Sequence, residues 1–371
     1  MKTFELDTPA VLVDAATLRS NIQRMQRLAA GFGVRLRPHV KTHKSPEIAR
    51  LQLEAGAAGI TVAKLGEAEV MVDAGLEDIL IANQIVGEAK ARRLRDLATR
   101  ARIAVLVDSE PGLGQLEDAF RGSDTALDVL IEVDTGKARC GLSDVRDIAH
   151  LAARVADATH VRLRGVETHE GHVPVGARGP DDLRERALEA GRELVDVAEA
   201  LRANGHDVED LSVGSTPAAP YTASVAGITE MRPGTYIFND VNQMAIDQAT
   251  PADCALSILA TVISRPAQGR AVLDAGSKSL FAEPARRAFA LPDYDGFGYV
   301  RESPETRIAN LSEEHAVVDI PAGVSFPAIG EKVRIIPNHV CPAVNLHEQL
   351  HIVEGGEVVA VWPIAARGRC R

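Results

Sequence analysis

The chain of 371 residues has little of several features that would each indicate a particular class of protein. Its four cysteines, Cys140, Cys254, Cys341 and Cys370, are far apart, which excludes a disulfide-built scaffold and favours a reducing cytoplasm. No run of about eighteen apolar residues is present, so a membrane-spanning helix is not expected. The start, MKTFELDTPAVLVD, carries early acidic residues and lacks an apolar core segment, so a secretory signal is not expected either.

Excess positive charge is also missing. The chain has 41 lysines and arginines against 52 acidic residues, a formal net charge of −11, and no basic block. Nucleic acid and anionic membrane surfaces are therefore poor candidates as partners, and a small-molecule substrate is favoured. No GxGxxG motif lies between a strand-like and a helix-like segment, which disfavours a dinucleotide-binding sheet.

Short apolar runs alternate with helix-like segments over the first two thirds of the chain. Apolar residues recur at helical spacing in 15–30, and 180–204 is a long amphipathic helix. Eight short, mostly apolar strands separated by helical segments predict an α/β fold, a parallel (β/α)8 TIM barrel. The predicted strands are 34–40, 59–63, 79–82, 103–107, 127–133, 161–168, 211–213 and 228–232.

From about residue 250 the pattern changes to strands joined by turns, and helical spacing is nearly absent. We expect a C-terminal β-rich domain that also takes up the N-terminal strand. The predicted division is a barrel at 15–250 and a β-rich domain made of 1–14 and 251–371. Its predicted strands are 255–263, 270–274, 314–320, 332–336 and 357–362.

A lysine between two histidines ends the first predicted barrel strand, in RPHVKTHK. Lys41 lies between His39 and His43, where it could be an amine nucleophile with proton-transfer partners. A solvated basic loop is the alternative. Because the active sites of such barrels lie at the carboxyl ends of the strands, Lys41 is a candidate catalytic residue.

The loops after strands seven and eight carry SVGSTPA (212–218) and RPGTY (232–236). These loops usually bind phosphate in such barrels, and their glycines, hydroxyls and backbone amides suit phosphate oxygens. Two ordinary turns are the alternative. With a lysine at strand one and no dinucleotide motif, the pattern suggests pyridoxal phosphate (PLP) held as a Schiff base.

Three further motifs carry reactive side chains. His339 and Cys341 are two residues apart near a strand end, a pair that suits zinc or a similar divalent metal with an open coordination position; a buried cysteine beside a bonded histidine is the alternative. His169 and His172, in THEGH, could be acid–base groups or metal ligands. Arg139, in DTGKARCG, could orient a ring or a carboxylate, or form an ordinary loop ion pair.

Several of these segments together resemble the D-threonine aldolase / D-serine dehydratase family, which consists of fold-type III PLP enzymes related to alanine racemase. The resemblance extends from Leu6 to about Trp362. It implies a barrel plus a β-rich domain, a divalent metal (Mn²⁺, Zn²⁺ or Mg²⁺) beside the cofactor, and a homodimer. The segments are LDTPAVLVD, LRPHVKTHKSPEIA, GITVAKLGEAEVM, DTGKARCG, VGSTPA, EMRPGTYIFND and IIPNHVCPAVNL.

The resemblance implies a role for each matching residue. Lys41 corresponds to the lysine that binds PLP covalently, and Arg139 to the arginine facing the ring oxygen. His339 and Cys341 correspond to the metal ligands. His172 corresponds to a proton-transfer residue, with His43 and His169 as further candidates. The phosphate-binding positions are Ser215, Thr216, Gly234, Thr235 and Tyr236.

The expected reaction is the cleavage of a D-β-hydroxy amino acid to glycine and an aldehyde, as in D-threonine aldolases. Cys341 departs from that expectation, because family aldolases tend to carry aspartate there and dehydratases cysteine, whereas the following PAVNL is aldolase-like. The alternative is a D-serine or 3-hydroxy-D-aspartate dehydratase, which yields a 2-oxo acid and ammonia. A non-catalytic PLP-binding protein and an amino-acid racemase are further alternatives, which the His-x-Cys motif disfavours.

Overall fold

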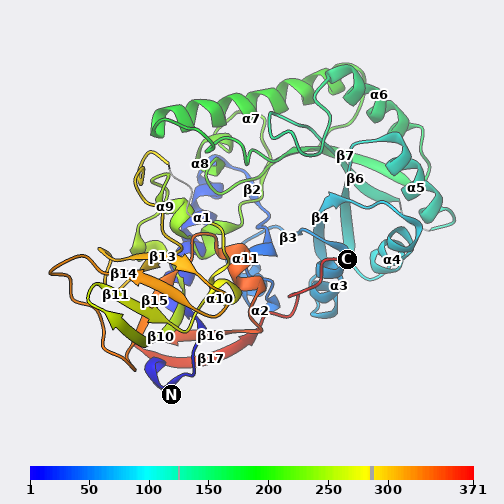
Figure 1. Cartoon of the computed structure of the whole chain (residues 1–371). Coiled ribbons are helices and arrows are strands. Elements are labelled where there is room, and N and C mark those ends of the chain that lie inside the picture. Colours follow the sequence, from blue (N-terminus) through cyan, green and yellow to red (C-terminus); the bar gives the residue numbers. More distant parts are fainter. Residues whose placement is uncertain (124–125, 285–287) are drawn as a thin grey trace.

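The computed structural model describes residues 1–123, 126–284 and 288–371, and these form two sheets (Figure 1). One sheet has eight parallel strands with helices packed around it. The other has nine strands and is mostly antiparallel. The predicted fold class, an α/β barrel joined to a β-rich part, is therefore confirmed.

The parallel sheet follows the chain order around the barrel, with β9 beside β2. Between the first two strands the ring is closed by a bridge between His39 and Thr61. Here the Thr61 N–H donates to Pro38 O at 2.9 Å, and the Ala58 N–H donates to Leu36 O at 2.8 Å. The strands are β2 (Arg35–Leu36), β3 (Ile60–Val62), β4 (Asp78–Gln84), β5 (Arg102–Val107), β6 (Leu127–Glu132), β7 (Val161–Thr168), β8 (Asp210–Val213) and β9 (Glu230–Met231).

The outer helices begin and end where the local sequence favours it. The carboxylate of Asp14 caps α1 by accepting from Thr17 N at 2.8 Å, and Gly33 ends the helix in the left-handed conformation, φ 69°. Asp144 caps α6 in the same way. The helices are α1 (Ala15–Phe32), α2 (Pro46–Glu54), α3 (Leu65–Asp73), α4 (Glu88–Ala98), α5 (Glu110–Phe120), α6 (Val145–Ala156), α7 (Pro180–Ala203) and α8 (Ala219–Thr222).

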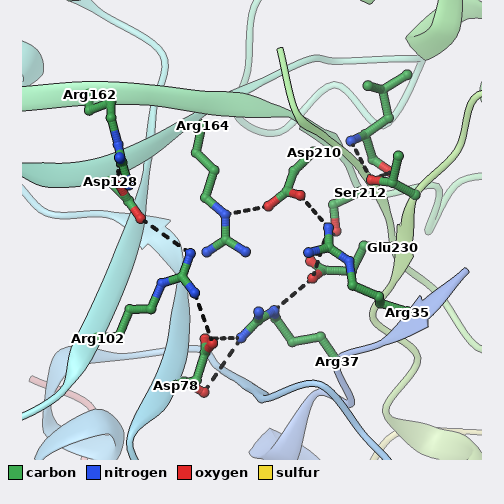
Figure 2. Close-up of polar contacts among 12 residues, drawn as sticks. Arg35, Arg37, Asp78, Arg102, Asp128, Arg162, Arg164, Asp210, Ser212 and Glu230 are labelled. Carbon is green, nitrogen blue, oxygen red and sulfur yellow. Dashed lines mark hydrogen bonds and ion pairs between the residues drawn. The ribbon is translucent and has the colours of Figure 1, made fainter. Parts of the chain in front are cut away.

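The start of the barrel strands carries a ring of ion pairs (Figure 2). Arg37 Nε donates to Glu230 at 2.8 Å, and its Nη1 donates to Asp78 at 2.5 Å. Around the ring, acidic side chains form ion pairs with arginines of neighbouring strands, as Asp210 does with both Arg35 and Arg164. The ring comprises Arg35, Arg37, Asp78, Arg102, Asp128, Arg162, Arg164, Asp210 and Glu230.

Further along the same strands the packing becomes apolar. Leu80, Ala104, Leu106 and Leu130 form a cluster of their own, separate from the large core between strands and helices. Each of them lies two or four residues after a charged ring residue on the same strand, so both belong to the same face of the sheet. The barrel strands therefore carry charge near their amino ends and apolar side chains further on.

The second sheet has the order β13-β14-β11-β10-β1-β16-β17, with β15 pairing β10 and β12. The N-terminal strand β1 (Ala10–Asp14) pairs antiparallel with β10 and parallel with β16. The other strands of this sheet are β10 (Leu256–Ala267), β11 (Arg270–Leu273), β12 (Tyr299–Val300), β13 (Arg307–Leu311), β14 (Ala316–Asp319), β15 (Lys332–Ile336), β16 (Gln349–Glu354) and β17 (Glu357–Pro363).

Short helical elements complete the described part of the chain. They are η1 (Thr3–Glu5), η2 (Val40–Thr42), η3 (Thr235–Ile237), η4 (Pro251–Asp253), α9 (Val241–Met244), α10 (Ser277–Leu280) and α11 (Val340–Asn345). The C-terminal tail crosses to the barrel, where the Ala366 N–H donates to Lys44 O at 3.0 Å and the end of the chain lies beside α3 (Figure 1). Loop 41–44 is therefore held by both parts of the molecule.

Several predicted strand boundaries were wrong. The first barrel strand was predicted to continue to residue 40, but it ends at Leu36, and the chain turns into the 3-10 helix η2. Strands β12, β13 and β16 were not predicted, because their apolar residues are few or interrupted by polar ones. Within the described ranges, no helix combines the length and the hydropathy needed to cross a membrane. Domain boundaries at residues 14 and 250 stay a prediction.

Candidate active site

The loop that carries Lys41 is fixed on both sides of the lysine. Before it, the His39 N–H donates to Pro233 O at 3.0 Å, which ties the loop to the segment after β9. After it, the Lys44 N–H donates to Val40 O at 2.8 Å, with Lys44 itself at a positive φ of 54°. Lys41 therefore lies in η2, five residues after the end of the first barrel strand and on the side of the barrel where the strands end.

The surroundings of Lys41 lower the pKa of its amino group. Burial is the largest influence and lowers this pKa, the Cys341 thiol raises it, and the Arg139 and Arg232 guanidinium groups lower it further. Glu67 acts in the opposite direction to the arginines. A lysine with a lowered pKa holds more of its neutral amine, which is the form that attacks a carbonyl.

His43 belongs to a buried hydrogen-bond network. Its Nδ1 accepts from the Ser45 N–H at 3.1 Å, so its Nε2 carries the proton and donates to Gln52 Oε1 at 3.2 Å. Gln52 Nε2 in turn donates to the Tyr236 hydroxyl at 2.8 Å. Burial lowers the pKa of His43 to about 3. Both ring nitrogens thus have partners, which favours a structural role over proton transfer.

The two predicted phosphate loops lie side by side. Thr216 Oγ1 accepts from the Tyr236 N–H at 3.1 Å, and Ser215 Oγ accepts from the Ala218 N–H at 3.3 Å. Within the described residues, the backbone N–H groups of 215, 216, 234 and 235 donate no hydrogen bond. Gly234 packs tightly, because a Cβ there would lie 2.9 Å from His39 O. The loops thus present several unpaired donors at the active face.

The residues after β7 contact the first of these loops. His169 Nδ1 donates to Gly214 O at 2.6 Å, while Glu170 accepts from the Gly214 N–H at 2.9 Å. Burial, with Lys41 and Arg139 nearby, lowers the pKa of His169 to about 3. Burial is also the main cause that lowers the pKa of His172, whose buried Nδ1 has no partner within the described residues. Both imidazoles are therefore neutral, and His172 has a free ring nitrogen.

Arg139 extends from the loop after β6. Its Nη2 lies 3.5 Å from Glu132 Oε1, and half of the side chain is exposed. The loop is closed by Asp134, which accepts from the Gly136 and Ala138 N–H groups at 3.0 Å. Asp134 thus holds the turn, and the half-exposed Arg139, in a long contact with Glu132, lies at the same face as Lys41.

His339 and Cys341 lie at the start of α11. The prediction placed this pair at a strand end, but His339 is the residue just before the helix, without a capping hydrogen bond, and Cys341 occupies the first turn. Cys341 Sγ lies 3.2 Å from Thr42 Oγ1, one residue after Lys41, and 3.9 Å from Thr235 Oγ1. The structure therefore brings the His-x-Cys pair to the lysine and to the second phosphate loop.

The two side chains also contact each other. Burial alone would lower the pKa of His339, but its hydrogen bond with Cys341 and the neighbouring acidic groups raise it to about 9. Burial alone would raise the pKa of the Cys341 thiol, but the hydrogen bond and the charge of His339 outweigh burial, so the pKa of Cys341 is lowered. Within the described part of the chain, no group of three or more His, Cys, Asp or Glu side chains is arranged to hold a metal.

Three residues near the site were not predicted. Arg232, in RPGTY, is buried, bonds Glu167 and Thr168 O, and lowers the pKa of Lys41. Glu67 pairs with Lys44 and accepts from the Ala63 N–H at 2.7 Å. Both lie in motifs that the sequence analysis quoted, so their charge at a strand end was an available signal. Glu283, which bonds His339, lies 56 residues away and gave none.

Comparisons with known proteins agree with this geometry. Residues 13–241 match the alanine racemase N-terminal domain, and residues 255–353 match a putative serine dehydratase domain. A D-threonine aldolase from Arthrobacter sp. is 37% identical over 368 residues, which cover 99% of this chain and 94% of the relative. A D-threo-3-hydroxyaspartate dehydratase from Delftia sp. (strain HT23) is 37% identical over 354 residues, 91% of each chain.

Solved structures show the same similarity. The D-threonine aldolase from Filomicrobium marinum superposes with a TM-score of 0.91 at 34% identity, over 100% of this chain and 97% of that one. The D-threo-3-hydroxyaspartate dehydratase, as a cysteine-to-alanine variant in the metal-free form, has a TM-score of 0.90 at 33% identity over 98% of each chain. The chain therefore belongs to the family of D-threonine aldolases and D-serine dehydratases, lyases with an alanine-racemase-like fold.

Proposed function

We propose that this protein is a PLP- and divalent-metal-dependent lyase that cleaves D-β-hydroxy amino acids to glycine and an aldehyde, as a D-threonine aldolase does. The observation that carries the proposal is the contact between the Lys41 loop and the His-x-Cys pair, with Thr42 Oγ1 at 3.2 Å from Cys341 Sγ. A cofactor lysine and a metal-binding pair at one face suit a reaction at adjacent carbons of one small substrate.

The residues present fit PLP. Lys41 has the lowered pKa that a carbonyl-binding lysine needs, and the unpaired backbone donors at 215, 216, 234 and 235 suit a phosphate group. Arg139, with half of its side chain exposed, could contact the ring oxygen. When bound, PLP supplies an electron sink for negative charge that develops at Cα.

The residues also fit a divalent metal. An imidazole and a thiol in contact are donors that borderline metals accept, and two protein ligands leave positions for water or substrate. The dehydratase relative with a cysteine-to-alanine change in the metal-free form supports a cysteine at such a site. A bound metal lowers the pKa of a coordinated hydroxyl.

The protein's own side chains divide the remaining work. We assign His172 to take the proton of the β-hydroxyl, because its ring is neutral and its Nδ1 has no partner within the described residues. His169 holds Gly214 through Nδ1, and its other ring nitrogen remains available as a second proton acceptor. His43, with both nitrogens bonded, is assigned to holding the Lys41 loop.

A dehydratase is the second candidate, and Cys341 favours it. In that reaction Lys41 would take the proton from Cα, and the β-hydroxyl would leave. The aldolase reaction removes the proton of the β-hydroxyl, and the dehydratase reaction removes the proton of Cα. Since this site offers a base for each proton, its residues alone do not decide between the two reactions. The 37% identity to an aldolase and to a dehydratase makes a direct assay necessary.

The deciding experiment is product analysis with D-threonine, D-serine and 3-hydroxy-D-aspartate, with L-threonine as the stereochemical control. Glycine and acetaldehyde from D-threonine support the aldolase; a 2-oxo acid with ammonia supports the dehydratase. Lys41→Ala should lose both turnover and the visible absorbance of bound PLP, and turnover unaffected by prolonged EDTA treatment would contradict the metal role. We also propose a homodimer, which sedimentation velocity can test.

A further inference from the structure

One ring nitrogen of His339 contacts a carboxylate. Its Nδ1 lies 2.9 Å from Glu283 Oε2, and the Cys341 side chain is close enough to the ring to influence the pKa of His339. Because Glu283 is a carboxylate acceptor, Nδ1 is the protonated nitrogen in the neutral ring and Nε2 carries the lone pair. The Glu283 contact thus leaves Nε2 as the ring nitrogen available to a metal once its proton is displaced.

The segment that carries Glu283 is attached to the residue next to His339. Asn338, which is buried, donates from Nδ2 to Glu283 O at 3.0 Å and to Gly296 O at 2.8 Å. Two contacts therefore link Glu283 to the His339 segment, one through its backbone and one through its carboxylate. These two contacts hold the Glu283 carboxylate beside the His339 imidazole.

We propose that Glu283 is the positioning residue of the metal site, which orients His339 by accepting its Nδ1–H and so presents Nε2 to a divalent metal. The inference rests on the metal-binding pair of the proposed function. Histidine ligands commonly donate their second N–H to a carboxylate, which fixes the ring and makes the ligating nitrogen more basic. Glu283 itself does not coordinate the metal and acts only through His339.

Zinc affinity tests this role without any assay of turnover. PLP-loaded protein would be titrated with Zn²⁺ against a chromogenic chelator. Glu283→Ala should weaken the affinity by about 10- to 100-fold, and Glu283→Gln, which keeps an acceptor oxygen but not the charge, by a smaller factor. Co²⁺-loaded protein gives a second readout, because a tilted imidazole changes the visible spectrum of the bound ion.

Glu302→Gln is the matched control, since Glu302 is a loop carboxylate bonded to Arg334 at 2.7 Å and as exposed as Glu283. It should bind zinc as the unchanged protein does. Equal zinc affinity and Co²⁺ spectra for Glu283→Ala, Glu283→Gln and Glu302→Gln would overturn the role of Glu283 alone. If the unchanged protein bound no zinc, or His339→Ala bound it equally well, the metal site itself would be wrong, and this inference with it.

Discussion

Glu170 and Gly214 are joined by a hydrogen bond of 2.9 Å from the glycine N–H to the carboxylate. The preceding residue, His169, donates to the carbonyl of the same glycine at 2.6 Å. Two consecutive residues after β7 therefore hold both backbone groups of Gly214, which begins the first phosphate loop. This arrangement couples the segment of the proton-transfer candidates to the segment proposed to bind phosphate.

Glu170 should make folding stability depend on pH. Burial raises the pKa of its carboxyl from 4.5 to about 7, and its Oε1 has no partner within the described residues. Below pH 4.5 the carboxyl is protonated in both folded and unfolded chains. Between pH 4.5 and 7 the unfolded chain binds fewer protons, so stability falls as pH rises, by an amount on the order of 3 kcal/mol.

Glu170→Gln should remove this loss while keeping an acceptor for Gly214. We expect the melting temperature of Glu170→Gln, relative to the unchanged protein, to rise between pH 5 and pH 8. Glu88→Gln, at an exposed position, is the control and should show no such change. A melting difference that is the same at both pH values would contradict the prediction.

Gly234→Ala should weaken PLP binding. The added Cβ would lie 2.9 Å from His39 O and 3.0 Å from Thr42 Oγ1, so either the phosphate loop or the Lys41 loop must move. A shift that costs about 1.4 kcal/mol lowers the affinity tenfold. Titration of the apoprotein with PLP, followed by absorbance, measures the change. Gly31→Ala, which meets no atom within 4 Å, is the control, and equal affinity of the two variants would refute the steric argument.

Tyr236→Phe separates the backbone of this residue from its side chain. The Tyr236 N–H lies in the phosphate region, whereas its hydroxyl is buried with Gln52. Removing the hydroxyl leaves the Gln52 amide without its acceptor and should cost about 1–3 kcal/mol of stability. PLP affinity should stay unchanged. A loss of affinity with unchanged melting temperature would instead assign the hydroxyl to the cofactor.

The predictable part of the site consists of residues whose neighbours in sequence carry the signal. Lys41 follows a predicted strand between histidines, and His339 and Cys341 are close in sequence, so local pattern made them candidates and the family resemblance favoured them over a solvated loop and a buried cysteine. The secondary structure at this pair was harder to predict, because a His-x-Cys sequence is compatible with a helix start as well as with a strand end. Spacing thus marked the pair as a candidate, and tertiary packing determined its conformation.

The unpredicted part depends on contacts between distant segments. Glu283 reaches His339 across 56 residues, and no local pattern relates them. Charged residues within short strands, such as Arg37 in the predicted strand 34–40 and Asp128 in 127–133, individually look like ordinary solvent-facing positions. Only the order of strands around the barrel places them in one ring, so their role follows from topology rather than from spacing.

That ring predicts a large cost for removing one partner. Arg37 and Glu230 are both almost fully buried, and Glu230 also accepts from Ser212 Oγ at 2.8 Å. Arg37→Met leaves the buried Glu230 carboxylate with only the longer ion pair to Arg35, at 3.9 Å, and should destabilise the fold by about 3–5 kcal/mol. The double change Arg37→Met with Glu230→Gln should recover part of this loss, because the uncompensated charge is gone. Arg121→Gln, which breaks the exposed pair with Asp118, is the control and should cost less than about 1 kcal/mol. Urea unfolding of the unchanged protein and the three variants measures these free energies. Similar losses for Arg37→Met and Arg121→Gln would contradict the argument.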